Sequence, residues 1–149
     1  MLNQLLYGDN LEVMRKMKSE SIDLIYLDPP FNSNRSYNFL YSQATGLPLP
    51  EEAEAFCDAW TLDIAKEEKI ESMADEMLRG GCNSDFIEFW QNWILALRNT
   101  NSKLLAYMVF MTERIVEMRR LLKPTGSIYL HCDPTASHYI KVVMDGIFG

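Results

Sequence analysis

The feature that most constrains this 149-residue chain is an apolar run that ends in two prolines. Residues 22–27 read Ile-Asp-Leu-Ile-Tyr-Leu, and Asp28, Pro29 and Pro30 follow directly. A short, nearly continuous apolar run predicts a strand of a parallel sheet with both faces covered by other elements. Proline has no backbone N–H to give to a neighbouring strand, so the strand must end there. The chain should therefore contain an α/β fold with a rigid turn at a strand end.

The rest of the sequence alternates between strand-like and helix-like patterns, which predicts a mostly parallel sheet with helices around it. The clearest helix covers 104–122, where apolar residues recur every three or four positions. Pro124 to Gly126 should end this helix, and Asp133 should cap the next one with Pro134 at its first position. The expected elements are a strand at 3–7, a helix at 10–17, a strand at 22–27, a loop at 32–50, helices at 51–78, 86–97 and 104–122, a strand at 127–132 and a helix from about 135 to 148.

Negative charge is concentrated in one window of the sequence. Residues 51–79 hold ten acids and three bases, which equals the net charge of −7 of the whole chain. The other residues are neutral in sum, so we expect an acidic helical insertion over about 50–100. Proteins that grip nucleic acid displace counterions with Lys and Arg, and such a surface is expected outside this stretch.

Cysteine usage and hydropathy favour a soluble cytoplasmic protein. Cys57, Cys82 and Cys132 lie far apart and form no CxxC pair, which argues against a disulfide framework and a structural zinc site. Residues 1–7 are too short and too uncharged for a signal peptide. No apolar run approaches the ~18 residues that span a membrane, and two histidines without a third ligand predict no metal site.

Polar groups fall at the carboxyl ends of the expected strands, where α/β sheets bind ligands. These groups are Asp9, Asp28, His131 and Asp133. The carboxylate of Asp28 and the carbonyl of Pro29 are two acceptors on one stiff turn, which suits an amino group with its two N–H donors. Phe31 adds an apolar face on which a heterocycle can stack.

The sequence around this turn resembles a known family of enzymes. Asp28-Pro29-Pro30-Phe31 is similar to the (D/N/S)PP(Y/F/W) motif of amino-methyltransferases. YGDNLEVM upstream, DPPFNSNRSYN across the turn and LLKPTGSIYLHCDPTASHY downstream resemble adenine-N6 DNA methyltransferases of the beta class. The resemblance covers 4–38 and about 106–149, and it implies a partial Rossmann-like fold that uses S-adenosylmethionine.

The resemblance also implies a role for each matching residue. Asp28 and the carbonyl of Pro29 would hydrogen-bond the exocyclic amine of a base flipped out of double-stranded DNA, and Phe31 would stack on that base. Pro30 completes the rigid turn. Asp9 would contact the adenine end of S-adenosylmethionine. An Asp at the first motif position favours adenine N6 over cytosine N4, and the amine would attack the methyl group directly.

The family's target-recognition domain and its Phe-x-Gly-x-Gly donor motif are not found in residues 1–149. We therefore expect the N-terminal catalytic half of a methyltransferase domain, a fragment that is inactive alone. The family's sheet would have gaps here, and unpaired buried backbone groups are costly. The chain should pair its strands in another way, form a homodimer, or hold the family's arrangement poorly. The expected partners are a second copy or a missing C-terminal half.

Several polar residues have two interpretations at this point. Asp9 can be a donor-binding group or a helix cap. His131 and Asp133 can line the base pocket, although a hydrogen-bonded structural role is favoured for His131. The residues after the turn can contact DNA or form an ordinary polar loop; they are Asn32, Asn34, Arg35 and Tyr37.

Two other functions compete with DNA methylation. The first is the same chemistry on RNA or on a glutamine side chain, although NPPY is more usual there. The second is a catalytically incomplete remnant, or a subunit that needs a partner half. The tryptophans Trp60, Trp90 and Trp93 are expected to pack in the core or the insertion rather than stack on bases.

Overall fold

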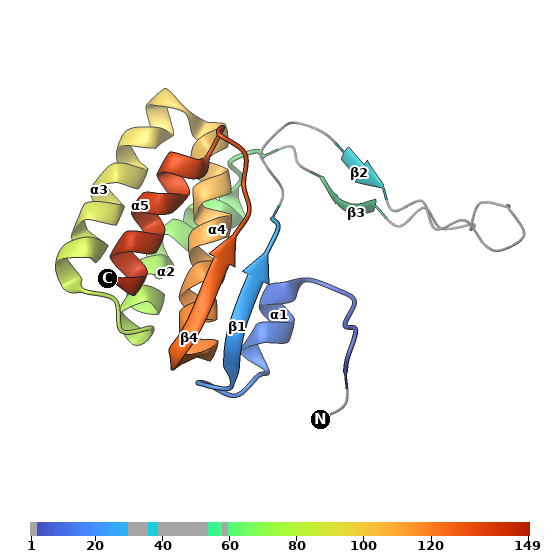
Figure 1. Ribbon diagram of the computed structural model, residues 1–149. Helices are drawn as coiled ribbons and strands as arrows, with labels where there is room; N and C mark the ends of the chain where they lie inside the picture. Colours follow the sequence, from blue (N-terminus) through green and yellow to red (C-terminus); the bar gives the residue numbers. More distant parts are fainter. Residues whose placement is uncertain (1–2, 30–35, 39–53, 58–59) are drawn as a thin grey trace, which may run out of the picture.

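The computed structural model describes residues 3–29, 36–38, 54–57 and 60–149. These residues form a mixed α/β structure with two separate two-stranded sheets (Figure 1). The elements are α1 (Asn10–Arg15), β1 (Ile22–Leu27), β2 (Ser36–Asn38), β3 (Glu54–Cys57), α2 (Ile64–Arg79), α3 (Ser84–Thr100), α4 (Ser102–Leu121), β4 (Leu122–Leu130) and α5 (Ser137–Phe148).

The sheet that matters for the site pairs β1 with β4 in parallel. Tyr26 lies opposite Tyr129 and Leu27 opposite Leu130, so both strands end at the same edge. The strand predicted at 22–27 is confirmed to the residue. Parallel pairing is confirmed for this sheet only, because β2 and β3 pair antiparallel.

The end of helix α4 differs from the prediction. The helix ends at Leu121, and β4 begins at once, so Pro124 to Gly126 lie inside the strand instead of separating it from the helix. The register shifts between Ile22 and Leu24, which face Leu122 and Ser127. An irregularity of this kind accommodates a proline that has no N–H to pair. A Cβ on Gly126 would lie 2.8 Å from a Leu122 methyl and 3.2 Å from the Asp23 carbonyl oxygen, so the close approach requires glycine.

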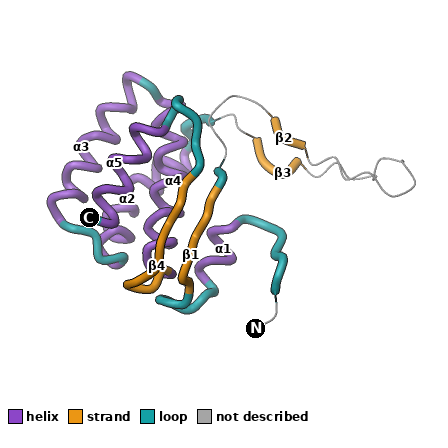
Figure 2. The backbone as a smooth tube through the Cα atoms, viewed as in Figure 1, coloured by secondary structure: helices purple, strands orange, loops and turns teal. Residues whose placement is uncertain are grey.

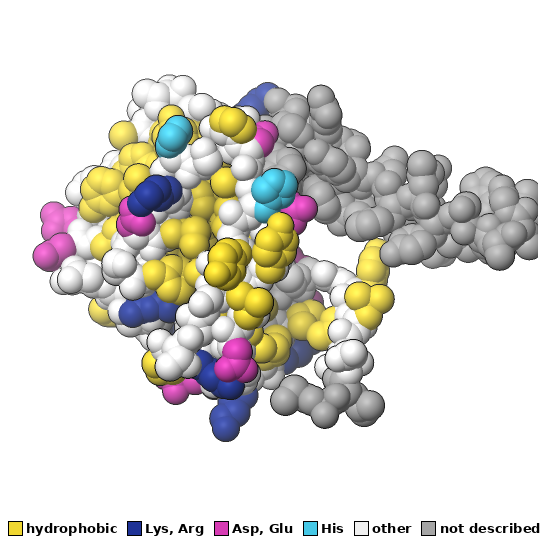
Figure 3. All heavy atoms as spheres, in the orientation of Figure 1, with side chains coloured by type: hydrophobic (Ala, Val, Ile, Leu, Met, Phe, Trp, Pro, Cys, Tyr) yellow, Lys and Arg dark blue, Asp and Glu magenta, His cyan; other side chains and the backbone are white. Residues whose placement is uncertain are grey.

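Only one face of the β1–β4 sheet is covered in the described part of the chain. Ile25 and Ile128 pack on a cluster of residues from α1 and α4. The opposite face is open, with Leu24, Tyr26 and Tyr129 all more than half exposed. Figure 3 shows these hydrophobic side chains gathered over β1 and β4. The prediction that both faces of this strand are covered is therefore wrong for the described residues.

The main core lies on the covered side of the sheet, around α4. This helix contacts α1, α2, α3, α5 and β4. In Figure 2, α2, α3, α4 and α5 lie together to the left of β1, and α1 lies to its right. Thirteen of the twenty residues of α4 are buried. The buried polar residue Thr112 accepts a hydrogen bond from the Trp90 ring N–H at 3.2 Å and donates to the Met108 carbonyl at 2.7 Å. Trp90 and Trp60 are both buried, which confirms core packing for these two tryptophans.

The insertion is not helical throughout. A helix was expected over 51–78, but α2 starts only at Ile64, where the Asp63 carboxylate accepts a hydrogen bond from the Lys66 N–H at 2.9 Å. Before it, β3 pairs with β2, which lies in the stretch predicted to be a loop. Pairing between segments distant in sequence overrides the local preference for helix or loop. The helices α3 and α4 agree with the predictions at 86–97 and 104–122, extended by a few residues at capped ends.

Two predictions near the ends of the chain are also corrected. Residues 3–7 belong to no sheet within the described residues, and Leu5 is 99% exposed. A strand forms only where a partner backbone satisfies its N–H and C=O groups. Asp133 does not cap α5, which starts at Ser137. Its carboxylate instead accepts a hydrogen bond from the Thr135 N–H at 2.9 Å and closes a turn.

A helix must be both long and apolar to cross a bilayer. No helix in the described part of the chain meets both requirements.

Candidate functional site

Asp28 and His131 meet at the carboxyl edge of the parallel sheet. The backbone N–H of His131 donates to the Leu27 carbonyl at 2.9 Å, which extends the β1–β4 pairing by one step. This register places the next residue of each strand side by side. The ring Nδ1 of His131 lies 3.1 Å from Oδ1 of Asp28. Both side chains remain open to solvent, at 60% and 57% exposure.

The chemistry of this pair limits which atom can donate. An ionised carboxylate only accepts hydrogen bonds, so a hydrogen bond between these two atoms requires the hydrogen on Nδ1 of His131. The second oxygen of Asp28 keeps its acceptor capacity. The half-buried Pro29 follows at once, and its backbone carbonyl oxygen is a further acceptor. The edge therefore presents hydrogen-bond acceptors to any group that approaches it.

Other predicted site residues fall into two groups. Asp133 lies on the segment after His131, where it shapes the turn through Thr135. Tyr37 lies in β2 opposite Phe56, and only its backbone is described. The following predicted residues lie outside the described residues, so their roles stay predictions: Pro30, Phe31, Asn32, Asn34 and Arg35.

Asp9 lies at the amino end of α1. Its Oδ1 accepts a hydrogen bond from the Leu11 N–H at 2.8 Å, so it is the helix cap. A short connection joins α1 to β1, and the two elements run in opposite directions (Figure 1). The Asp9 side chain is 50% exposed. The capping interpretation of Asp9 is thus confirmed, and donor binding stays a prediction.

Arg114 of α4 holds Asp9 from the interior, and the sequence analysis did not find it. One terminal nitrogen of its guanidinium lies 2.8 Å from each oxygen of Asp9, and Nε donates to Asn10 at 2.9 Å. The guanidinium carbon lies 3.4 Å from the centre of the Phe110 ring. The side chain is only 8% exposed. Burial lowers the pKa of Arg114, and the neighbouring Asp9 opposes that shift.

A signal for Arg114 was present in the sequence. Met111, Arg114 and Met118 follow one another at spacings of three and four, which places the arginine on the apolar stripe of the helix. A charged residue at such a position requires a buried partner. The partner itself, 105 residues away in sequence, could not be deduced from the spacing.

Comparison with known proteins gives the family of the chain. Residues 22–149 match the DNA methylase family, N6_N4_Mtase, which is most of the chain. The chain belongs to this DNA methylase family. No solved structure matches it.

Curated relatives of this methylase chain are subunits of restriction-modification enzymes. The StyLTI Mod subunit of the type III enzyme from Salmonella typhimurium is 29% identical over 150 residues, or 99% of this chain and 18% of that protein. The EcoP15I Mod subunit from Escherichia coli is 26% identical over 97% of the chain and 19% of its own length. The EcoPI Mod subunit from Escherichia phage P1 is 27% identical over 99% of the chain and 19% of its own length. The chain thus spans less than a fifth of the length of these relatives.

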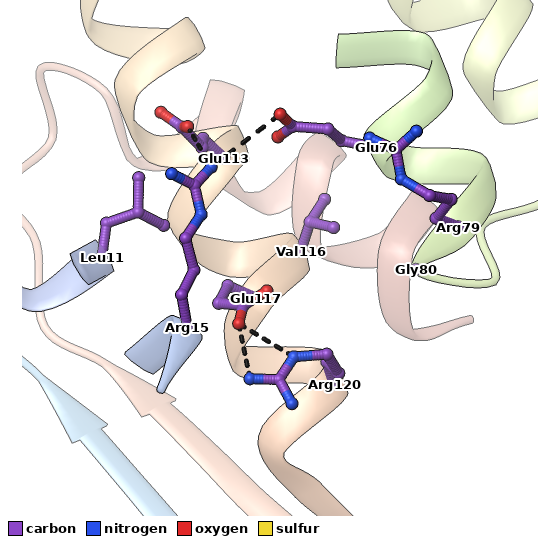
Figure 4. A pocket seen from close by; sticks show the side chains of 9 residues that line it. All are labelled: Leu11, Arg15, Glu76, Arg79, Gly80, Glu113, Val116, Glu117 and Arg120. Carbon is purple, nitrogen blue, oxygen red and sulfur yellow. Dashed lines mark hydrogen bonds and ion pairs between the residues drawn. The ribbon is translucent and has the colours of Figure 1, made fainter. Parts of the chain in front are cut away.

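A cavity of about 330 Å³ lies elsewhere in this methylase chain, between α1, α2 and α4 (Figure 4). Its charges neutralise one another. Arg15 and Glu113 lie 3.0 Å apart, and Lys69, at its border, lies 2.6 Å from Glu76 and 2.5 Å from Glu113. None of the predicted site residues lines it. The network joins three helices and leaves the carboxyl edge of the sheet as the candidate site.

Metal chemistry has no support in the described part of the methylase chain, where no group of three or more His, Cys, Asp or Glu residues is arranged to hold an ion. The two cysteines whose side chains are described, Cys82 and Cys132, are free thiols. Burial is the largest cause of a raised pKa for both. They remain protonated at neutral pH and are poor nucleophiles there.

Proposed function

We propose that this chain carries the base-binding edge of a DNA methyltransferase that moves a methyl group from S-adenosylmethionine to N6 of a flipped-out adenine. The observation that carries the proposal is the Asp28 carboxylate at the carboxyl end of β1, open to solvent and followed by the Pro29 carbonyl. Family membership supports the chemistry, and Asp in the first motif position favours adenine over cytosine. The names of the relatives support a role in restriction-modification.

The acceptors at this edge match the demands of the amine. An adenine amino group offers two N–H donors, which the free oxygen of Asp28 and the Pro29 carbonyl can accept together. Both bonds strengthen as positive charge develops on the nitrogen during attack, so they stabilise the transition state more than the bound base. Phe31 would stack on the base and hold its plane. The base has to leave the duplex first, because its amine is unreachable within the stack.

S-adenosylmethionine supplies the methyl group as an electrophile on a sulfonium sulfur. Asp9 is the residue of this chain proposed to hold its adenine end. The fit is chemically sound, since the carboxylate is half exposed and keeps acceptor capacity beyond its bonds to Leu11 and Arg114. The other contacts to S-adenosylmethionine are proposed to come from a further stretch of polypeptide. This stretch would correspond to the parts of the relatives that lie outside the matched segment.

A second candidate is a subunit that works only with a partner half. It is favoured by the open face of the β1–β4 sheet, where Leu24, Tyr26 and Tyr129 are exposed. Both candidates share the same chemistry at Asp28. They differ in whether this chain alone transfers a methyl group.

The test is methyl transfer in two settings. The purified chain is incubated with tritiated S-adenosylmethionine and double-stranded DNA, and N6-methyladenine is measured by nucleoside mass spectrometry. The same chain is also placed in the Salmonella Mod subunit in exchange for its matched segment. The proposal expects N6-methyladenine in at least one setting, and its loss in Asp28→Ala. If only the Mod subunit that carries this chain is active, the partner-half candidate is supported. If that Mod subunit folds and binds DNA but forms no N6-methyladenine, methyl transfer by this chain is refuted.

A further inference from the structure

The geometry points to His131 as the positioning residue of Asp28: its Nδ1–H holds one carboxylate oxygen and leaves the other for the base amine. This inference rests on the proposed function and adds a residue to it. The Nδ1 to Oδ1 distance of 3.1 Å is the observation behind it. The two residues are 103 positions apart, so the fold and not the local sequence brings them together.

The backbone fixes where the imidazole begins. The His131 N–H donates to the Leu27 carbonyl at 2.9 Å, directly before Asp28. Because the parallel register is constant from Leu24 to Leu27, the ring starts from a rigid position rather than from a loose loop. Nδ1, the ring nitrogen nearer the backbone, is the one that meets Asp28. A short side chain at residue 131 with a hydrogen-bond donor is therefore sufficient to reach Asp28.

Asp28 needs such a partner because its own geometry is soft. The last torsion of an aspartate is broad, so the plane of an unrestrained carboxylate is poorly fixed. A hydrogen bond to Oδ1 selects one orientation, and Oδ2 is then presented to the amine. Orientation of reacting groups lowers the barrier of the chemical step. The expected gain in the rate of transfer is about tenfold, in the range of one modest hydrogen bond.

The same geometry separates positioning from proton transfer. A ring whose Nδ1–H is given to a carboxylate acts through that hydrogen, and it does not need to gain or lose a proton during the reaction. Asn carries an N–H donor at nearly the position of Nδ1 and does not titrate. Gln carries its amide one bond further out, near the position of Nε2. The pair His131→Asn and His131→Gln thus distinguishes the two roles, with His131→Leu as the variant without a donor.

The structural part is tested on the purified chain without any substrate. Nitrogen NMR of the His131 ring is expected to show the hydrogen on Nδ1 near neutral pH, and to lose that preference in Asp28→Ala. The melting temperature is expected to stay unchanged in His131→Leu, because both side chains are more than half exposed. A hydrogen on Nε2 in the wild-type chain overturns the inference.

The functional part is tested by single-turnover transfer, in whichever of the two settings is active. His131→Leu and His131→Gln are expected to slow the chemical step about tenfold with the KM for S-adenosylmethionine unchanged, and His131→Asn to stay within about threefold of wild type. In an Asp28→Ala background, His131→Leu should add no further loss. Equal losses in the Asn and Leu variants, or no loss in Leu, overturn the inference while leaving the proposed function intact. If the wild-type protein transfers no methyl group in either setting, the proposed function fails first and this assignment fails with it.

Discussion

Asp9 and Asp28 are the two carboxylates to which the proposed function gives a role, yet they are held in opposite ways. Asp9 binds a guanidinium that is almost completely buried, and the same arginine reaches Asn10 and the Phe110 ring. Asp28 binds an imidazole that is as exposed as itself. A carboxylate anchored to a buried charge contributes to the stability of the fold. A carboxylate held by an exposed partner contributes little stability and stays available to a ligand.

The largest effect on stability is expected for Asp9→Ala. The change removes the cap of α1, worth about 1 kcal/mol, and leaves the buried guanidinium of Arg114 without its carboxylate. The two terms together should lower the free energy of unfolding by about 3 kcal/mol, a value reduced from that of a fully buried pair because Asp9 is half exposed. Urea denaturation measures it. A loss below about 1 kcal/mol would mean that Asp9 acts only as a cap.

Arg114→Met should cost less, about 2 kcal/mol of unfolding free energy. Methionine fills much of the same space and removes the buried charge, while Asp9 can turn to water. The cost is the loss of the bonds to Asp9 and Asn10 and of the contact with Phe110. Calorimetric melting of the single variants and of the double variant gives the coupling between residues 9 and 114. If the two losses simply add, the pair is not coupled and the comparison with Asp28 fails.

Asp28→Ala should leave the free energy of unfolding within about 0.5 kcal/mol of wild type, because exposed pairs contribute little. The same variant should lower methyl transfer by about a hundredfold, since it removes an acceptor on the reacting amine. Thermal melting and the tritium assay on one preparation measure both. A stability loss comparable to that of Asp9→Ala would show that Asp28 is a structural residue.

The smallest effect is the pH dependence of the unfolding free energy. It compares Cys82 in the interior with Cys132 near the edge of the sheet. Burial raises the pKa of the Cys82 thiol in the folded chain, so the folded state keeps this proton at a pH where the unfolded chain releases it. The resulting stability is complete below the unfolded pKa of about 8.5 and declines as pH rises above it. Cys82→Ala should flatten this decline in urea denaturation between about pH 8 and 10. Cys132→Ala, near the edge of the sheet, should flatten this decline less than Cys82→Ala does. A larger effect of Cys132→Ala would mean that desolvation is stronger at residue 132.

Local patterns in the sequence predicted the elements that their own residues determine. The strand at 22–27 was found to the residue, because an apolar run stopped by prolines leaves little choice. The helices α3 and α4 were found because their apolar stripes are long and regular. The carboxyl edge was predicted as the candidate site because parallel strands bring their ends together, and Asp28 and His131 do meet there.

The remaining features depend on contacts between distant residues. The four residues of β3 carry no strand signal of their own, and β3 exists through its pairing with β2. The irregular start of β4 depends on how Gly126 approaches the Asp23 carbonyl oxygen. Arg114 shows in the sequence only as a charge on an apolar stripe, while its partner Asp9 is known only from the fold. The open face of the sheet is likewise a property of packing and leaves no trace in the alternation of residues.

The central position of α4 has a consequence for how the chain unfolds. This helix contacts four other helices and β4, and most of its residues are buried, so each of these neighbours loses packing once α4 is lost. Sub-global opening should therefore be rare for the body of the molecule, and melting should follow a single cooperative transition. Amide hydrogens in the middle of α4 should exchange with solvent only through global unfolding. Their exchange rates then report the stability of the whole assembly of helices, while those of residues 3–7 report almost nothing.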